Sequence, residues 1–214
     1  ARREPVASRF VLRDERSFGF EVGARVPGRR LVIDPGIVWS NSLGGASTEV
    51  GQCCAVDASG TVCIGGWTSS LTFPVTPGVF DTTFGDLEGF VSKLAPDGSV
   101  PFTTLIGGLV PRIPPPNGVS AHDEVTGLAI DPQGRIFVTG NADSTDFPTT
   151  PGAFRTATLP GGRNVFAACI AANGATLDYS TIVWVGASTA LALDDQGQAI
   201  LVGYTTNPFW PVTA

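Results

Sequence analysis

An eight-residue phrase occurs twice in the chain and constrains its fold more than any other feature. "FPVTPGVF" occupies residues 73–80, and "FPTTPGAF" occupies residues 147–154, 74 positions later. "WPVT" at residues 210–213 repeats the start of the phrase, 63 positions after the second copy. Because prolines cannot donate to a β-ladder, each copy predicts a loop of fixed geometry. The chain is therefore built from repeats.

A second set of matching segments has the same spacing. "AVDASG" begins at residue 55, "AIDPQG" at residue 129 and "ALDDQG" at residue 192. "LGG" at residues 43–45 returns as "IGG" at residues 106–108. The repeat therefore has a period of 63 residues, and the longer spacing of 74 contains an 11-residue insertion. The insertion lies in "GLVPRIPPPNGVSAHDE", where we expect a surface loop.

Each period contains two hairpin signals. "QCCAVDASGTVCIGGWT" has two strand-forming runs joined by Asp-Ala-Ser-Gly, and "GFVSKLAPDGSVPFTTLIGG" has two joined by Pro-Asp-Gly. The proline phrase lies between the two hairpins. Consecutive apolar residues in the strands are typical of sheets covered on both faces, and no amphipathic helix pattern separates them. Four antiparallel strands repeated at a fixed period predict the blade of a β-propeller.

The predicted fold class is all-β, a β-propeller of four-stranded antiparallel blades, here a partial segment of about two and a half to three blades. We expect a leader with a β-hairpin over residues 1–37 and propeller repeats over residues 38–214. The predicted blades cover residues 51–108, 125–182 and 188–214, the last incomplete. Within the proline phrase we expect glycine to set the backbone angles and four aromatic side chains to fill gaps between blades, namely Phe73, Phe80, Phe147 and Phe154.

These segments resemble the bacterial SBBP-type β-propeller repeat family of exported proteins. The resemblance rests on "SLGG", on "AVDASGTVCIGGWTSSLTFPVTPGVFDTTFGDLEGFVSKLAPDGS" and on "AIDPQGRIFVTGNADSTDFPTTPGAF", and it covers roughly residues 31–214. "GFEVGARVPGRRLVIDP" also looks like the stretch that precedes the first such repeat. The second repeat departs from the pattern by its insertion and by "VFAACIAANG". The resemblance implies the fold and export, and it implies no catalytic residue.

Charge and composition exclude several classes of partner. Residues 1–30 hold eight of the 13 basic residues, which predicts a solvated Arg-rich hairpin or an interaction arm. The rest of the chain is acidic, so we expect no nucleic acid partner. No long apolar run occurs, so we expect no membrane span. The chain contains no methionine, so we expect a processed protein or a segment of a longer one.

Four cysteines leave two readings open. If Val56 pairs with Thr61 across the turn, Cys54 lies opposite Cys63, and an exported protein could join them in a disulfide. The alternative is reduced cysteines packed in strands as small apolar residues. Adjacent Cys53 and Cys54 lack the spacing of a zinc site.

Few polar residues suggest chemistry. His122, Asp123 and Glu124 lie in the insertion, and with Asp146 and Trp67 they are the candidate residues for contact with a ligand or partner. We expect His122 to be an exposed loop residue. The recurring aspartates of the DxxG turns fit turn formation better than calcium binding, since no EF-hand string occurs. We therefore expect no catalytic residue, no metal and no cofactor.

The sequence favours a non-catalytic propeller scaffold or binding module, for adhesion or assembly, of an exported or cell-surface protein. Export alone leaves the periplasm open as another compartment. Its expected partners are the remaining blades of a longer chain, another protein subunit, or a glycan stacked on tryptophan. One alternative is a polysaccharide hydrolase or lyase, which requires convergent carboxylates or a metal. Another is a subunit of a filament or larger extracellular assembly.

Overall fold

The computed structural model describes residues 6–12, 18–24, 40–111, 121–160 and 162–205. These residues form twelve β-strands and no helix, so none of them belongs to a helix that could cross a membrane. The chain divides into two compact units, Ala1–Val38 and Trp39–Ala214. In the first unit, β1 (Ser8–Leu12) pairs antiparallel with β2 (Phe18–Val22). The third copy of the proline phrase lies outside the described residues.

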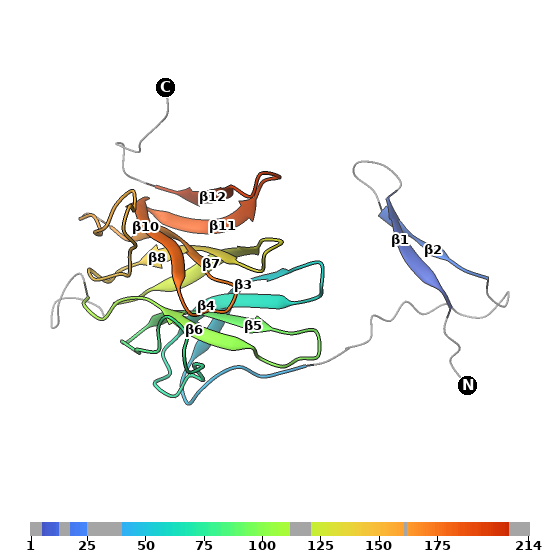
Figure 1. Ribbon diagram of the computed structural model, residues 1–214, viewed down its shortest axis with the longest axis horizontal. Helices are drawn as coiled ribbons and strands as arrows, with labels where there is room; N and C mark the ends of the chain where they lie inside the picture. Colours follow the sequence, from blue (N-terminus) through green and yellow to red (C-terminus); the bar gives the residue numbers. More distant parts are fainter. Residues whose placement is uncertain (1–5, 13–17, 25–39, 112–120, 161, 206–214) are drawn as a thin grey trace, which may run out of the picture. The chain divides into compact units, whose positions relative to one another are not determined.

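The second unit contains three antiparallel sheets (Figure 1). The first sheet consists, in this order, of β3 (Glu49–Val56), β4 (Val62–Thr68), β5 (Glu88–Leu94) and β6 (Phe102–Ile106). The second sheet consists of β7 (Glu124–Ile130), β8 (Ile136–Ala142), β9 (Asn164–Ile170) and β10 (Leu177–Val185). The third sheet consists of β11 (Ala187–Leu193) and β12 (Ala199–Tyr204). The predicted all-β fold with four antiparallel strands in each full repeat is confirmed.

The hairpin turns after β3, β7 and β11 share one hydrogen-bonding pattern. Oδ1 of Asp57 accepts from the backbone N–H groups two and four residues later, and Asp131 and Asp194 do the same. The turn glycines have positive φ, for example 87° at Gly60 and 79° at Gly134, a region that favours glycine. These bonds account for the three aspartates as turn residues.

The proline phrase joins β4 to β5 and β8 to β9, as predicted. Its first aromatic residue packs on the third strand of its own sheet: ring centroids are 4.8 Å apart for Phe73 and Phe90, and 4.5 Å apart for Phe147 and Phe166. The expectation for Phe154 is wrong. Its side chain is 65% exposed because it lies on the surface beneath the guanidinium of Arg155, 4.9 Å from the ring centroid, rather than between sheets.

The three sheets stack through their first strands, since β3 contacts β7 and β7 contacts β11 (Figure 1). The main core lies between the first and second sheets, and every residue of β8 and β9 is buried. A smaller cluster of Phe73, Phe90 and Leu105 covers the other face of the first sheet. In β8 and β9, consecutive apolar residues therefore reflect a sheet that is covered on both faces.

Each first strand carries a register shift at the same repeat position, and a glycine lies opposite it. The shifts fall at Gly51/Cys53 in β3, Val125/Gly127 in β7 and Ser188/Ala190 in β11. A Cβ atom on Gly140 of β8 would collide with the backbone oxygen of Glu124, and Gly66 and Gly203 face equivalent oxygens in their own sheets. The second strand of each sheet thus needs a glycine where the bulged strand approaches most closely.

Candidate binding surface

The five candidate residues for ligand contact form two neighbouring clusters. The rings of Trp67 and His122 are 5.4 Å apart in an edge-to-face arrangement, and His122 Nε2 lies 3.7 Å from Glu124 Oε2. Asp123 and Asp146 instead bind consecutive backbone amides at the end of the first sheet, from Gly108 to Val110. The structure therefore brings the predicted residues near one another, but each carboxylate already has donors.

Glu124 is the centre of the first cluster. Its Oε1 accepts from Asn141 Nδ2 at 2.9 Å and pairs with Arg163 NH1 at 2.8 Å, and its Oε2 accepts from Gln52 Nε2 at 2.9 Å. Burial acts to raise the pKa of the Glu124 carboxyl, but the bonds from Asn141 and Gln52 and the charge of Arg163 outweigh burial and lower that pKa. The arrangement holds an anion that joins strands, rather than a base ready to take a proton.

Sequence reasoning missed Arg163 and Asn141, which complete this cluster. Arg163 Nε lies 3.0 Å from Asp143 Oδ2, and its NH2 donates to the backbone oxygen of His122 at 3.2 Å. Asn141 Oδ1 accepts from Ser188 N at 3.1 Å, which ties the second sheet to β11. Neither residue stands in a recognisable motif. The pairing of β7, β8 and β9 within the second sheet brings both residues to Glu124.

Asp123 connects the first and second sheets. Its Oδ2 accepts from Gly108 N and from Ser144 Oγ, and its Oδ1 accepts from the backbone N–H groups of Asp143 and Ser144. Asp123 lies between β6 and β7, as predicted, but its side chain is buried, and Glu124 is a buried first residue of β7 rather than a loop residue. Four hydrogen bonds to Asp123 offset part of the cost of burying its charge, but burial still raises the pKa of its carboxyl.

The counterpart of Asp123 in the first repeat is Glu49. Glu49 Oε1 accepts from Gly45 N at 3.1 Å and from Thr68 Oγ1 at 3.1 Å. Gly45 and Gly108 are the last glycines of "LGG" and "IGG". A carboxylate that caps this glycine is therefore a repeated structural device. Among the described residues, no group of three or more His, Cys, Asp or Glu side chains is arranged to hold a metal ion.

Of the two readings left open for the cysteines, the structure has the reduced one: Cys54 and Cys63 form no disulfide, and all four cysteines are free. Asp57 Oδ1 accepts a hydrogen bond from the backbone N–H of Thr61. The loop therefore spans Asp57–Thr61, and Val56 pairs with Val62. This register places Ile64 opposite Cys54 and leaves Cys54 and Cys63 on opposite faces of the sheet.

Thiol reactivity should reflect this register. Burial raises the pKa of the Cys53, Cys63 and Cys169 thiols to about 12, whereas Cys54 is exposed. A thiol reagent at pH 8 should therefore react quickly with one thiol per native chain and with all four after denaturation. Cys54→Ser should remove the fast reaction. Recovery of only two thiols from the unfolded, unreduced chain would contradict the free-cysteine assignment.

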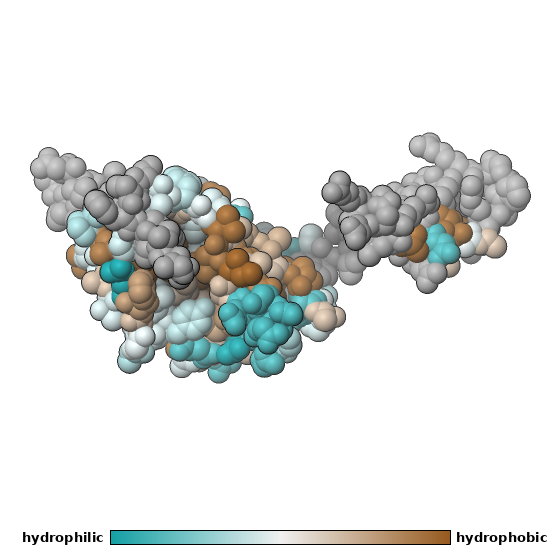
Figure 2. Space-filling model, turned by 90° about the horizontal axis from the view of Figure 1, so that it is seen from above, coloured by the Kyte–Doolittle hydropathy of each residue, from teal (hydrophilic) through white to brown (hydrophobic). Residues whose placement is uncertain are grey.

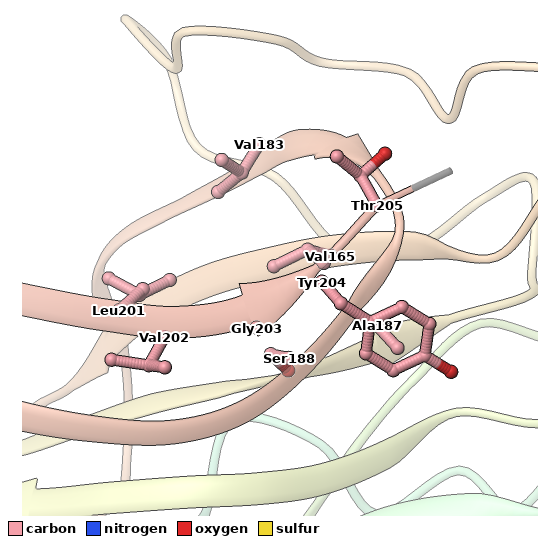
Figure 3. A pocket seen from close by; sticks show the side chains of 9 residues that line it. All are labelled: Val165, Val183, Ala187, Ser188, Leu201, Val202, Gly203, Tyr204 and Thr205. Atoms are coloured by element: carbon pink, nitrogen blue, oxygen red, sulfur yellow. The ribbon is translucent and has the colours of Figure 1, made fainter. Parts of the chain in front are cut away.

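An open apolar groove lies between the second and third sheets. It has a volume of about 410 Å³ and is lined mainly by small apolar side chains from β9 to β12 and the residue that follows (Figure 3): Val165, Val183, Ala187, Ser188, Leu201, Val202, Gly203, Tyr204 and Thr205. Figure 2 views the molecule from the side on which β12 lies in Figure 1, and it shows hydrophobic surface on the unit that contains the three sheets. The groove is shaped for apolar contact and carries no charged side chain.

The strand β12 also has a free edge among the described residues. In the full sheets the second strand pairs with a third, β4 with β5 and β8 with β9, but β12 pairs with β11 alone. A free strand edge offers unpaired backbone N–H and C=O groups to another strand. The groove and this edge together form an apolar candidate site for contact with another protein segment.

Comparison with known proteins agrees with the repeat. Residues 102–148 match the family model SBBP, described as a beta-propeller repeat. The matched residues run from β6 through β7 and β8 to the proline phrase, so they cross the junction between the first and second sheets. This match confirms the resemblance to the SBBP-type repeat. No curated protein matches the chain.

Proposed function

We propose that this chain is a segment of a β-propeller that serves as a non-catalytic scaffold or binding module of an exported or cell-surface protein. The chain's SBBP repeat at residues 102–148 and its stacked antiparallel sheets support the propeller. Its carboxylates at the candidate surface already have backbone or side-chain donors, which supports a structural rather than a catalytic task. Export is the part of the proposal that follows from the family resemblance.

The proposal rests on the exposure of one repeat position in the three sheets. Cys63, Phe137 and Ile200 occupy the same repeat position, the second residue of the second strand in each sheet. Cys63 is fully buried in the core shared with the second sheet, and Phe137 is 5% exposed with its ring near Tyr179 of its own sheet, whereas Ile200 is 52% exposed. Val202 and Tyr204 on the same face of β12 are 57% and 67% exposed. This face, defined by Ile200, Val202 and Tyr204, is the site at which a further sheet would pack.

The partner in this proposal is another apolar sheet of the same kind, from a longer chain or from another subunit. Alternating apolar side chains on a bare sheet face favour burial against such a partner. A glycan would instead need polar groups that converge beside an aromatic side chain. The nearest such arrangement among the described residues is the pair Trp67 and His122, whose rings already pack edge to face against each other.

Self-association tests whether this face binds another sheet. Wild-type chain should associate with rising concentration in analytical ultracentrifugation, and Val202→Lys should weaken association by about tenfold or more because a charge would be buried in an apolar contact. Leu71→Lys is the matched control, since Leu71 is 79% exposed and lies outside this face. Equal association of all three proteins, or none by the wild type, would contradict the proposed stacking face.

A further inference from the structure

The carboxyl group of Glu88 is buried with one oxygen unsatisfied. Glu88 is the first residue of β5 and is 1% exposed. Its Oε1 accepts from Gly85 N at 2.9 Å, but its Oε2 has no hydrogen-bond partner. An ionised carboxylate in this position would lack the donors that Asp123 has nearby. Leaving a buried charge unsatisfied is costly, so the ionised form is disfavoured.

The unsatisfied oxygen faces a second carboxyl group. A Cβ atom on Gly107 would collide with Glu88 Oε2 and would lie 2.8 Å from Asp123 Oδ2, so both oxygens meet above this glycine. The charged groups that act on Glu88 are all acids: Asp123 immediately before β7, Asp81 in the loop before β5, and Asp146 after β8. Two ionised carboxylates at this contact would repel each other strongly.

The second repeat has a neutral residue, Asn164, at the position of Glu88. Thr68 pairs with Glu88 in the first sheet, and Ala142 pairs with Asn164 at the same place in the second sheet. Asn164 Oδ1 accepts from Leu159 N, and its Nδ2 donates to the backbone oxygens of Leu159 and Gly162. The equivalent residue is thus a neutral group that both accepts and donates.

We propose that Glu88 is a neutral carboxylic acid that shares its proton with Asp123, so that an acid–carboxylate pair joins the first and second sheets. The Oε2–H group of Glu88 donates toward Asp123 Oδ2, and Asp123 keeps its negative charge. The backbone bond from Asp123 N to Leu87 O, 3.0 Å long, holds the two residues together. Loss of the shared proton at alkaline pH breaks the pair and loosens this junction.

Linkage gives the direction of the pH effect. Burial, followed by the charge of Asp123, raises the pKa of Glu88 from 4.5 to about 9. Between these values the unfolded chain has released the proton while the folded chain retains it. The folded chain therefore binds more protons, and its stability falls as pH rises through this window.

Glu88→Gln isolates the effect, because glutamine supplies a neutral donor of nearly the same shape. The urea midpoint of the wild type should fall between pH 5 and pH 8.5, and the midpoint of Glu88→Gln should fall less. Asp97→Asn is the matched control, since it removes the same charge from an exposed turn where hydrogen bonds from Ser99 lower the pKa of Asp97. Its midpoint should follow the wild-type dependence over this range.

Infrared spectroscopy supplies a readout that general destabilisation would not move. At pH 7 the wild type should show the carbonyl band of a protonated carboxylic acid, and Glu88→Gln should lack it. Absence of the band from the wild type, or identical pH dependence for wild type and Glu88→Gln, would overturn the proposal. A rise in the wild-type midpoint with added Ca²⁺ that Glu88→Gln lacks would also overturn it, in favour of a bound cation.

Discussion

Replacing Phe166 with alanine should lower the free energy of unfolding by about 3–5 kcal/mol. Phe166 is fully buried in the core between the first and second sheets. Its ring packs at 4.5 Å against Phe147, the first residue of the second proline phrase. The substitution removes a large apolar surface and leaves a cavity that rigid strands cannot close. Urea denaturation followed by circular dichroism or tryptophan fluorescence measures the loss.

Phe154→Ala is the matched control, because Phe154 is the last aromatic residue of the same phrase but is 65% exposed. Its loss should change stability by less than about 1 kcal/mol. Equal effects of the two substitutions would contradict the assignment of Phe166 to a core between stacked sheets.

Gly140→Ala should destabilise the chain by about 3 kcal/mol or more, at the upper end of the usual cost of overpacking. A Cβ atom at this position would collide with the backbone oxygen of Glu124 and would lie 2.6 Å from the ring of Phe166. A backbone oxygen in a bulged strand cannot move aside as a flexible side chain can. The yield of folded protein and its urea midpoint should both fall.

Gly51→Ala is the control for Gly140→Ala. Gly51 also lies at a bulge, but a Cβ atom there would have no neighbour within 4 Å. It should change stability by no more than about 0.5 kcal/mol. A tolerated Gly140→Ala would show that the first and second strands do not approach each other as closely as this register requires.

The strands, hairpins and connecting loops could be predicted from the sequence because each depends on local chemistry. Asp57 and Gly60 specify a hairpin turn through the conformations that only a few residue types favour. The proline phrase could be predicted as a loop because its prolines have no backbone N–H to donate to a β-ladder. Because the same turns and proline phrase recur in each repeat, the repeats were expected to form similar sheets, and the first two repeats each form a four-stranded sheet.

The register and the candidate surface depend on contacts that local patterns do not contain. The Cys54–Cys63 pairing failed because Asp57 closes a loop that ends at Thr61, which moves the register by one residue. Asp123 and Glu124 follow a polar, proline-rich stretch, and their burial arises from donors such as Ser144 and Arg163 that are distant in sequence. Their burial therefore could not be judged without the pairing of β7, β8 and β9.

A crystal structure of the chain would show how successive sheets are related and would therefore decide whether they are propeller blades. We expect β3, β7 and β11 to lie next to one another in sequence order, and the same rotation to relate the first sheet to the second and the second to the third. It also predicts another sheet, from a neighbouring copy or an attached repeat, on the face of Ile200, Val202 and Tyr204. A two-sheet sandwich in which Phe73 and Phe147 occupy unrelated positions would contradict it.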